Sequence, residues 1–269
     1  MARRTTNSSW EDADVARGER CARRLLDRLG VVNPTETEID NLAFLAGALV
    51  RDVPMSGAQG RLCKVRRRAI ISVNEEVTYR PRRRFVVAHE LGHLQLHEDV
   101  NDLSLCTDDD ISERYDAGTE REANAFAAEF LMPRHLWTKL TDVRFPTLDV
   151  VSRLADDFEV AFTAAAIRFV KLSPERCAVV FSRESRVVWA ALGPEFGYAI
   201  RRGSLDSYTL ATDYFKKGRV GIRPETVSAR AWIESNRISN DDDMIEHCRP
   251  IPSIGAVLSL LWIRPDAEY

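Results

Sequence analysis

The sequence predicts an α+β protein with a mainly helical first part, which includes a small β-strand segment, and a smaller α+β second part. Two observations predict this class. Apolar residues recur at helical spacing through much of residues 10–171, whereas short β-rich runs replace that pattern after Pro174. With 269 residues, of which 45% are hydrophobic and 29% are charged, the chain is long enough for one large domain or two ordinary ones.

The first part is expected to contain several helices, because its apolar residues follow the i, i+3, i+4 pattern. The expected helices cover residues 10–29, 36–49, 83–96 and 119–133, and a helical pair covers 147–171 with a break near 160–162. The pair has the rhythm of a helix-turn-helix, which any tight helical hairpin shares. Residues 69–74 are β-rich and residues 98–117 are acidic, which predicts a strand and an irregular loop.

The second part is expected to begin with a hairpin, because two β-rich runs flank the short polar stretch Ser182-Arg-Glu-Ser185. Further strands are expected near residues 197–200, 227–232 and 256–263. We therefore expect a disordered N-terminus over 1–14, a first domain over 15–172 and a second domain over 173–269.

Composition excludes several classes of protein. The longest apolar stretch near the start, residues 43–50, is too short to cross a bilayer, and the basic N-terminus lacks the apolar region of a signal peptide. The protein is therefore expected in the cytoplasm, with no membrane partner. Five scattered cysteines without a CxxC pair argue against a disulfide framework and against a four-cysteine zinc site.

Charge is unevenly distributed, although the net charge is only −3. Residues 61–84 are strongly basic, and residues 98–122 are acidic. A basic cluster of this kind can face phosphate backbones, or it can form a solvated and ion-paired surface.

Residues His89-Glu90-Leu91-Gly92-His93 form an HExxH motif within an expected helix. On a helix, residues i and i+4 share a face, so both imidazoles can reach one zinc ion at about 2.0–2.1 Å. Glu90 is then placed to take a proton from the attacking water and pass it to a leaving amine. Gly92 would let another backbone approach the helix closely.

A catalytic zinc site needs a third protein ligand and one open position. A metzincin would need glycine and histidine where this sequence has Leu96 and Asp99, so that class is discounted. The helix expected over 119–133 offers three glutamates, and the spacing leaves open which of them binds the metal. They are Glu120, Glu122 and Glu129.

Two motifs in this order resemble the ImmA/IrrE metallopeptidases. The residues that carry the resemblance are Ile71-Ser-Val-Asn74, then Arg84-Phe85-Val-Val-Ala88-His-Glu-Leu-Gly-His93 with His97, and finally Glu122-Ala-Asn-Ala-Phe-Ala-Ala-Glu-Phe-Leu-Met-Pro133. As a whole, the resemblance covers roughly residues 15–172. It implies a zincin-like catalytic domain. In that family the HExxH histidines and the glutamate before Ala-Asn bind zinc, which maps onto His89, His93 and Glu122. The motif glutamate, here Glu90, is implied to be the catalytic base.

The resemblance also implies a substrate. Peptidases of the family cut helix-turn-helix (XRE-type) repressors, often after DNA damage or phage challenge. We therefore expect a zinc endopeptidase, a monomer, that cleaves such a repressor in a stress or antiviral defence response. Many relatives begin with a DNA-binding helix-turn-helix domain, for which this chain has no room before residue 15. The substrate is expected to lie along the strand over 69–74 and to add to its edge.

Two residues beside the motifs are expected to support the ligands. His97 falls one turn beyond His93, and Asn124 follows Glu122 by two residues. Either side chain could donate or accept a hydrogen bond next to a metal ligand. Their alternative roles are a helix-end histidine and a hydrogen bond at the edge of the core.

Cys106 lies in the acidic segment 98–117, which connects the two halves of the zinc site. A thiolate is a good zinc ligand and would occupy the position that the attacking water needs. The hypothesis is therefore an inhibitory cysteine switch in which Cys106 caps the metal. An ordinary loop cysteine is the alternative.

The C-terminal region 173–269 is expected to be a regulatory or sensor domain, loosely similar to a GAF domain. Its aromatic residues and cations could form a stacking platform for single-stranded nucleic acid, or they could pack as core and rim. A single-stranded DNA or small-ligand activator is therefore expected. The aromatic residues are Trp189, Tyr198, Tyr208, Tyr214, Phe215 and Trp232.

A second interpretation belongs to a different functional class: a DNA-binding transcriptional regulator with a structural zinc site. The basic cluster and the helical pair at 147–171 favour it. Glu90 argues against it, because a purely structural site would not require that residue.

Overall fold

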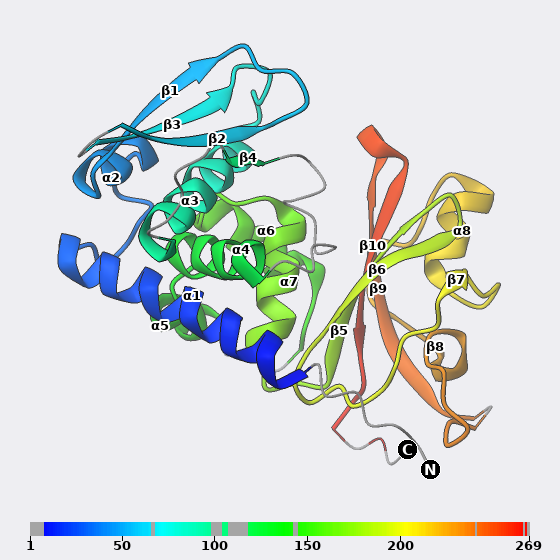
Figure 1. Ribbon diagram of the computed structural model, residues 1–269. Helices are drawn as coiled ribbons and strands as arrows, with labels where there is room; N and C mark the ends of the chain where they lie inside the picture. Colours follow the sequence, from blue (N-terminus) through cyan, green and yellow to red (C-terminus); the bar gives the residue numbers. More distant parts are fainter. Residues whose placement is uncertain are drawn as a thin grey trace. The chain divides into compact units, whose positions relative to one another are not determined.

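The computed structural model describes residues 8–65, 68–97, 104–106, 118–141, 145–239, 241–265 and 267. Its contacts divide the chain into two compact units. Unit 1 is Met1–Trp137 with Asp157–Ala161, and unit 2 is Thr138–Asp156 with Phe162–Tyr269. Each unit combines helices with a β-sheet, which confirms the α+β class (Figure 1).

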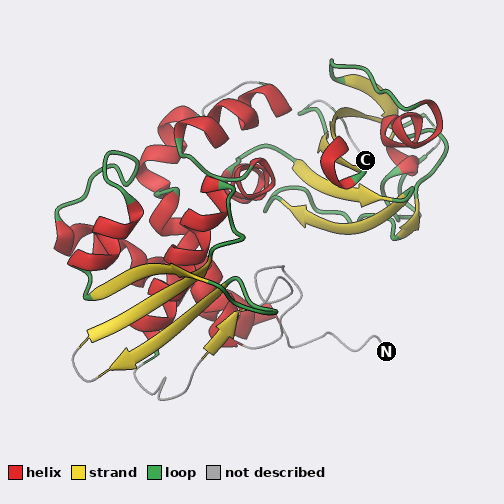
Figure 2. Cartoon of the chain, turned by 90° about the horizontal axis from the view of Figure 1, so that it is seen from above, coloured by secondary structure: helices red, strands yellow, loops and turns green. Residues whose placement is uncertain are grey.

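Unit 1 contains a four-stranded sheet with the strand order β1-β3-β2-β4. Its strands are β1 (Ala48–Val53), β2 (Gly60–Val65), β3 (Arg68–Asn74) and β4 (Ser104–Cys106). Strand β1 pairs with β3 in parallel, and β2 is antiparallel to both β3 and β4. These strands are among those drawn in yellow in Figure 2. Strand β3 therefore lies inside the sheet, and the described edge strands are β1 and β4.

The helices of unit 1 bring three distant parts of the chain together. They are α1 (Ser8–Leu29), α2 (Ile39–Leu45), α3 (Arg80–Leu96) and α4 (Gly118–Leu131). Helix α4 packs against both α1 and α3. A glycine permits each approach: a Cβ at Gly18 of α1 would meet the Glu122 carbonyl oxygen, and a Cβ at Gly92 of α3 would lie 3.1 Å from the Ala123 Cα. The close approach expected at Gly92 is thus confirmed.

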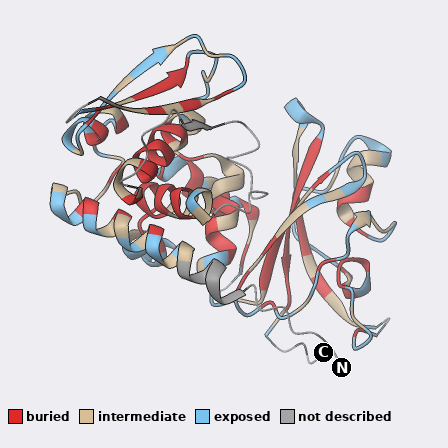
Figure 3. Cartoon of the chain, viewed as in Figure 1, coloured by how far each residue is buried: buried red, intermediate tan, exposed pale blue. Residues whose placement is uncertain are grey.

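The HExxH helix lies in the core of unit 1. Val86, Val87 and Leu91 are completely buried in α3, and so are Phe126 and Phe130 in α4 (Figure 3). The two phenylalanine rings stack with their centroids 5.5 Å apart. Burial of this apolar surface holds α3 and α4 side by side.

Unit 2 contains a six-stranded antiparallel sheet with the order β7-β6-β5-β10-β9-β8. Its strands are β5 (Cys177–Arg183), β6 (Arg186–Leu192), β7 (Gly203–Ser204), β8 (Glu225–Ser228), β9 (Asp243–Ile251) and β10 (Ala256–Trp262). The helices α6 (Leu148–Asp157), α7 (Phe162–Leu172) and α8 (Leu210–Lys217) belong to it, with two short 3₁₀ helices at Ala229–Ala231 and Pro252–Ile254. Helix α5 (Arg134–Leu140) spans the division between the units.

Several expected elements differ from the structure. The helix expected over 36–49 is shorter, because Gly47 adopts a φ of 96° and the chain continues as β1. Helix α1 begins at Ser8, within the segment expected to be disordered. The helical pair breaks where expected, but α6 and α7 group with the C-terminal sheet, whereas the domain boundary was expected near residue 173. None of the described helices is long and apolar enough to span a membrane.

Candidate metal centre

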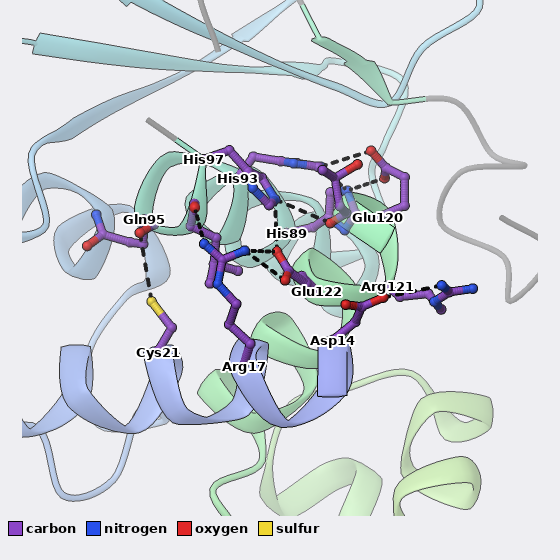
Figure 4. Close-up of polar contacts among 12 residues, drawn as sticks. Asp14, Arg17, Cys21, His89, His93, Gln95, His97, Glu120, Arg121 and Glu122 are labelled. Atoms are coloured by element: carbon purple, nitrogen blue, oxygen red, sulfur yellow. Dashed lines mark hydrogen bonds and ion pairs between the residues drawn. The ribbon is translucent and has the colours of Figure 1, made fainter. Parts of the chain in front are cut away.

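Three side chains from α3 and α4 converge at one point. His89 Nε2 and His93 Nε2 lie 3.0 Å apart. The Glu120 carboxylate places Oε2 3.2 Å from His89 Nε2 and Oε1 3.2 Å from His93 Nε2 (Figure 4). Both histidines are buried, and the Glu120 side chain is 17% exposed. Within the described residues these three form a His-His-Glu set with the composition of a catalytic zinc site.

The geometry of this triangle fits a metal ion. Tetrahedral ligands at 2.0–2.1 Å from zinc are separated by about 3.3 Å. The three observed separations of 3.0, 3.2 and 3.2 Å are close to that value. One cation can therefore contact both Nε2 atoms and a carboxylate oxygen of Glu120, and among the described residues a fourth tetrahedral position remains for water or substrate.

Hydrogen bonding on the far side of His89 supports the same conclusion. His89 Nδ1 lies 3.0 Å from Asn124 Oδ1, which can only accept, so the ring hydrogen belongs on Nδ1. The Nε2 atom of His89 then carries a lone pair, and it faces a carboxylate oxygen of Glu120. Two electron-rich atoms at this distance require a proton or a cation between them, and a bound metal satisfies both.

Glu90, which follows His89 in the motif, is completely buried. Strand β2 passes directly beside it, because a Cβ at Gly60 would lie 2.6 Å from Glu90 Oε1 and 2.6 Å from Val86 Cγ1. Glycine at position 60 thus leaves room for the Glu90 carboxylate at the place where β2 crosses α3.

The third member of the set is Glu120, whereas the family resemblance mapped the ligand onto Glu122. The structure places the Glu122 carboxylate on Arg17 of α1, with Arg17 Nη1 2.8 and 2.7 Å from its two oxygens. Glu129 also faces α1 and lies 3.3 Å from Arg23 Nη1. In this structure neither glutamate belongs to the His-His-Glu set, so Glu120 replaces Glu122 as the candidate ligand.

Helix geometry explains this difference. Residues 120 and 124 are four positions apart, so they share one face of α4, and that face points at α3. Residues 122 and 129 are seven positions apart and share the opposite face, which points at α1. The signal that sequence reasoning missed is therefore the Glu120–Asn124 spacing, in which the ligand and the hydrogen-bond partner of His89 are one turn apart.

His97 lies beyond the set and is the C-terminal capping residue of α3. Its Nε2 is 3.4 Å from the Thr119 carbonyl oxygen and 3.7 Å from Glu122 Oε2. Burial is the main factor that lowers the pKa of His97. The side chain thus contacts residues on either side of Glu120 and makes no contact with the Glu120 carboxylate in the described structure.

The residues of this site lie in a part of the chain that matches a known protein family. The model of the Peptidase_M78 family, described as the IrrE N-terminal-like domain, matches residues 46–170. This part of the chain belongs to the ImmA/IrrE family. The resemblance seen in the motifs is confirmed, and the family indicates a metallopeptidase-type domain. Peptidases of this family are generally zinc-dependent, which agrees with the donor set in the structure.

One solved structure similar to the chain is described as a Mycobacterium tuberculosis transcriptional regulator. It aligns with a TM-score of 0.60 and 14% sequence identity, over 91% of this chain and 76% of that chain. At this identity the similarity establishes the fold alone. No match was found among curated proteins.

Two further expectations for the ImmA/IrrE domain concern its sheet. The strand expected to receive the substrate, residues 69–74, is β3, and both of its edges are already paired. A peptide cannot add to it, so that expectation is wrong. Cys106 ends β4, where its Cα is paired with that of Gly60 in β2. The Cys106 side chain lies outside the described part of the structure, so the cysteine switch stays a prediction.

Arginines of the basic cluster in the ImmA/IrrE domain form ion pairs with carboxylates. Arg83 binds Asp40 and Asp52, and Arg80 binds Glu38 and Glu159. The structure therefore favours the ion-paired alternative at these two arginines over a surface that faces phosphate.

Aromatic residues of unit 2 divide into two groups. Trp232 is 1% exposed and donates to Glu246 Oε2 from its indole nitrogen at 2.9 Å, so it belongs to the core. Trp189 is only partly buried and stacks on Phe181, with centroids 5.3 Å apart and planes 5° apart. Tyr208 is 78% exposed. A stacking platform in unit 2 would have to use Trp189 or Tyr208 rather than Trp232.

Proposed function

We propose that the chain is a zinc-dependent endopeptidase that cleaves a helix-turn-helix transcriptional repressor in a stress, DNA-damage or phage-defence response. One observation carries the peptidase assignment: the ligand atoms of His89, His93 and Glu120 lie within 4.8 Å of one another, on helices that also bury Glu90 of the same motif. The family assignment supports the reaction class. The repressor as substrate comes from the family resemblance.

In this proposal each residue has a separate role. His89 and His93 present their Nε2 atoms and Glu120 presents a carboxylate oxygen, while Asn124 fixes the tautomer of His89. Bound zinc would polarise the scissile carbonyl and lower the pKa of the attacking water. Glu90 takes the proton of that water and returns it to the leaving amine, and its burial keeps bulk solvent from the carboxylate.

The substrate is proposed to run along β2 rather than β3. Strand β2 carries Gly60, which packs against Glu90, and in the described part of the chain β4 pairs with β2 over the three residues from Gly60 to Leu62. An extended peptide paired with β2 near Gly60 would bring a backbone carbonyl next to the metal and the base. In the structure β4 occupies that part of the edge.

Cys106 is proposed as the inhibitory residue. In an antiparallel sheet, directly paired residues have Cα atoms about 4.5–5.5 Å apart. The pairing of Cys106 with Gly60 thus holds its backbone within one strand spacing of the residue that contacts Glu90. A thiolate from this position would take the open ligand position of zinc, and release of β4 would free both the metal and the edge of β2.

Activation is proposed to act through unit 2, as a sensor domain of GAF-like type whose ligand is single-stranded DNA or a small molecule. The partly buried Phe181–Trp189 stack supports this proposal, because aromatic side chains next to arginines can stack with bases without sequence preference. Arg183 follows Phe181 by two residues on β5, and its side chain is 57% exposed.

A second candidate function is a DNA-binding regulator with a structural zinc site. It is favoured by one observation, the description of the structural neighbour as a transcriptional regulator. Glu90 argues against it, because a purely structural zinc site would not require that residue.

The experiment that separates the two candidates uses co-expression. The chain is expressed with the helix-turn-helix protein encoded beside its gene, as wild type and as Glu90→Gln, under resting and DNA-damaging conditions. The proposal expects damage-dependent cleavage by wild type and none by a Glu90→Gln protein with full zinc content. Equal zinc with no cleavage by either protein, together with retained DNA binding, would favour the regulator.

A further inference from the structure

We propose that Arg17 of α1 is a positioning residue of the metal centre. Its guanidinium ties the helix that carries Glu120 to the end of the helix that carries both histidines, and it keeps Glu122 away from the metal. The inference rests on the proposed function, because it assigns a residue to the zinc site that this function requires.

The contacts of Arg17 form a bridge between α4 and α3. Arg17 Nη1 donates to both carboxylate oxygens of Glu122, at 2.8 and 2.7 Å, and Nη2 donates to the Leu96 carbonyl oxygen at 3.0 Å (Figure 4). Glu122 follows Glu120 by two residues in α4, and Leu96 follows His93 by three residues in α3. One side chain thus spans the two helices next to the ligands on each.

The bridge matters because it adds a directional polar link to the apolar contact between α3 and α4. A Cβ at Gly92 would lie 3.1 Å from the Ala123 Cα and 3.1 Å from the Phe126 ring, so the two helices approach closely there through apolar groups. A rotation or a small slide of α4 would turn Glu120 away from the histidines. The Arg17 bridge opposes both movements, because its two nitrogens bind one atom group on each helix.

Arg17 also decides which glutamate faces the metal. The Glu122 side chain is 6% exposed, and Glu122 Oε2 is already 3.7 Å from His97 Nε2. A buried carboxylate without a cation is costly, so a Glu122 freed from Arg17 would be drawn towards a cation bound by His89 and His93. With both oxygens bound to Arg17, Glu122 is held on the α1 side of α4.

The chain provides a matched control at the same helix pair. Asp14, three residues before Arg17 on α1, forms an ion pair with Arg121 of α4, with Asp14 Oδ2 3.2 Å from Arg121 Nη2. This pair joins α1 to α4 as Arg17 does, and Arg121 lies between Glu120 and Glu122 in the sequence. No described contact of Asp14 reaches α3. Loss of the Asp14 pair therefore reports a general weakening of the α1–α4 contact.

Arg17 lies outside residues 46–170, the part that matches the family model. The bridge thus makes the first helix part of the metal centre, although α1 lies outside the matched residues. Arg17→Lys separates the two roles of the side chain: lysine keeps a positive charge beside Glu122, but its single nitrogen cannot repeat the two-sided arrangement.

The test measures zinc affinity by competition with a chromophoric chelator, and the absorption spectrum of the cobalt(II)-substituted protein. It compares wild type, Arg17→Gln, Arg17→Lys and Asp14→Asn, each checked for folding by thermal unfolding. We expect zinc affinity to fall about 10–100-fold in both Arg17 variants, as for other residues that orient ligands, with an altered cobalt spectrum. Asp14→Asn is expected to keep the wild-type affinity and spectrum.

The outcomes are distinct. Wild-type affinity and spectrum in Arg17→Lys would overturn the bridge, and an equal loss in Asp14→Asn would reduce Arg17 to a general packing residue. Because Arg17→Lys retains the charge beside Glu122, it tests the inference even if Arg17→Gln fails to fold. Absence of zinc binding in wild type would instead contradict the proposed function, and the inference with it.

Discussion

Asn124 and His89 are joined by a hydrogen bond of 3.0 Å between Oδ1 and Nδ1, from one helix of the candidate metal centre to the other. The bond fixes the hydrogen of the imidazole on the side away from the cluster and orients the Nε2 lone pair towards Glu120. It also makes Asn124 the partner that prepares His89 for a metal, one turn along α4 from the candidate ligand Glu120.

Replacement of Asn124 by leucine should lower zinc affinity about 10–100-fold, because His89 loses the acceptor that sets its tautomer and ring orientation. Asn124→Asp, which keeps an acceptor at the same place, should bind zinc nearly as wild type does. Chelator competition on both purified variants measures the difference. Equal affinities for leucine and aspartate variants would show that the hydrogen bond has no part in the metal site.

Gly60→Ala should reduce cleavage without removing zinc. The added methyl group would lie 2.6 Å from both Glu90 Oε1 and Val86 Cγ1, so the carboxylate or the strand must move. Misplacement of a catalytic group by about 1 Å can cost on the order of 100-fold in rate. The single-turnover cleavage rate of Gly60→Ala should fall about 10–100-fold, whereas its zinc content should stay unchanged. Glu90→Gln gives the rate that remains without the base. An unchanged rate would mean that Glu90 acts from another position.

Cys106→Ser tests the inhibitory role. If the thiolate takes the open position on zinc, serine should raise basal cleavage in the absence of any activator, since a hydroxyl is a much weaker zinc ligand. The measurement is repressor cleavage by purified protein without DNA, and Cys63→Ser on the neighbouring strand β2 serves as the control. Unchanged basal cleavage in Cys106→Ser would remove the switch from the account.

A buried histidine in unit 2 should make stability depend on pH. Leu148 N–H donates to His247 Nδ1 at 3.0 Å, and His247 Nε2 lies 3.2 Å from the Ile222 carbonyl oxygen, so the neutral ring fits both partners. Burial lowers the pKa of His247, with Asp149 opposing this shift and Arg249 adding to it. The folded state therefore binds the proton less readily than the unfolded chain does.

The resulting stability is present above the unfolded pKa of about 6.5 and is lost as pH falls below it towards the folded pKa. We expect the melting temperature of wild type to fall more steeply between pH 7 and pH 5 than that of His247→Gln, which cannot titrate there. Thermal unfolding of both proteins across this pH range measures the difference in slope. Parallel curves would mean that His247 binds protons equally in both states.

The sequence was sufficient to predict the metal-binding helix, because HExxH combines a chemical signature with helical spacing. The hairpin of β5 and β6 was also predictable, since the polar turn contains Glu184 and Ser185, which adopt φ values of 52° and 58° between two apolar runs. Strand β9 was missed for the opposite reason. It buries Glu246 and His247, so its sequence pattern looks polar although the strand lies inside the sheet, between β10 and β8.

The third ligand could not be read from the motif alone. Choosing between Glu120 and Glu122 depends on which face of α4 meets α3, and this is decided by contacts with α1 that lie far away in the sequence. Arg17 and Arg23 each bind one of the other two glutamates, which leaves Glu120 for the histidines. The edge strand was missed likewise, because the pairing of β2 with β4 joins residues more than 40 positions apart.

The central claim is that His89, His93 and Glu120 form the zinc site. It is tested most directly by zinc stoichiometry in protein purified without added chelator, for wild type, Glu120→Ala and Glu90→Gln. The account predicts one zinc per chain in wild type and in Glu90→Gln, and a loss of zinc in a folded Glu120→Ala protein. Full zinc occupancy in Glu120→Ala would contradict it and return the third ligand to Glu122.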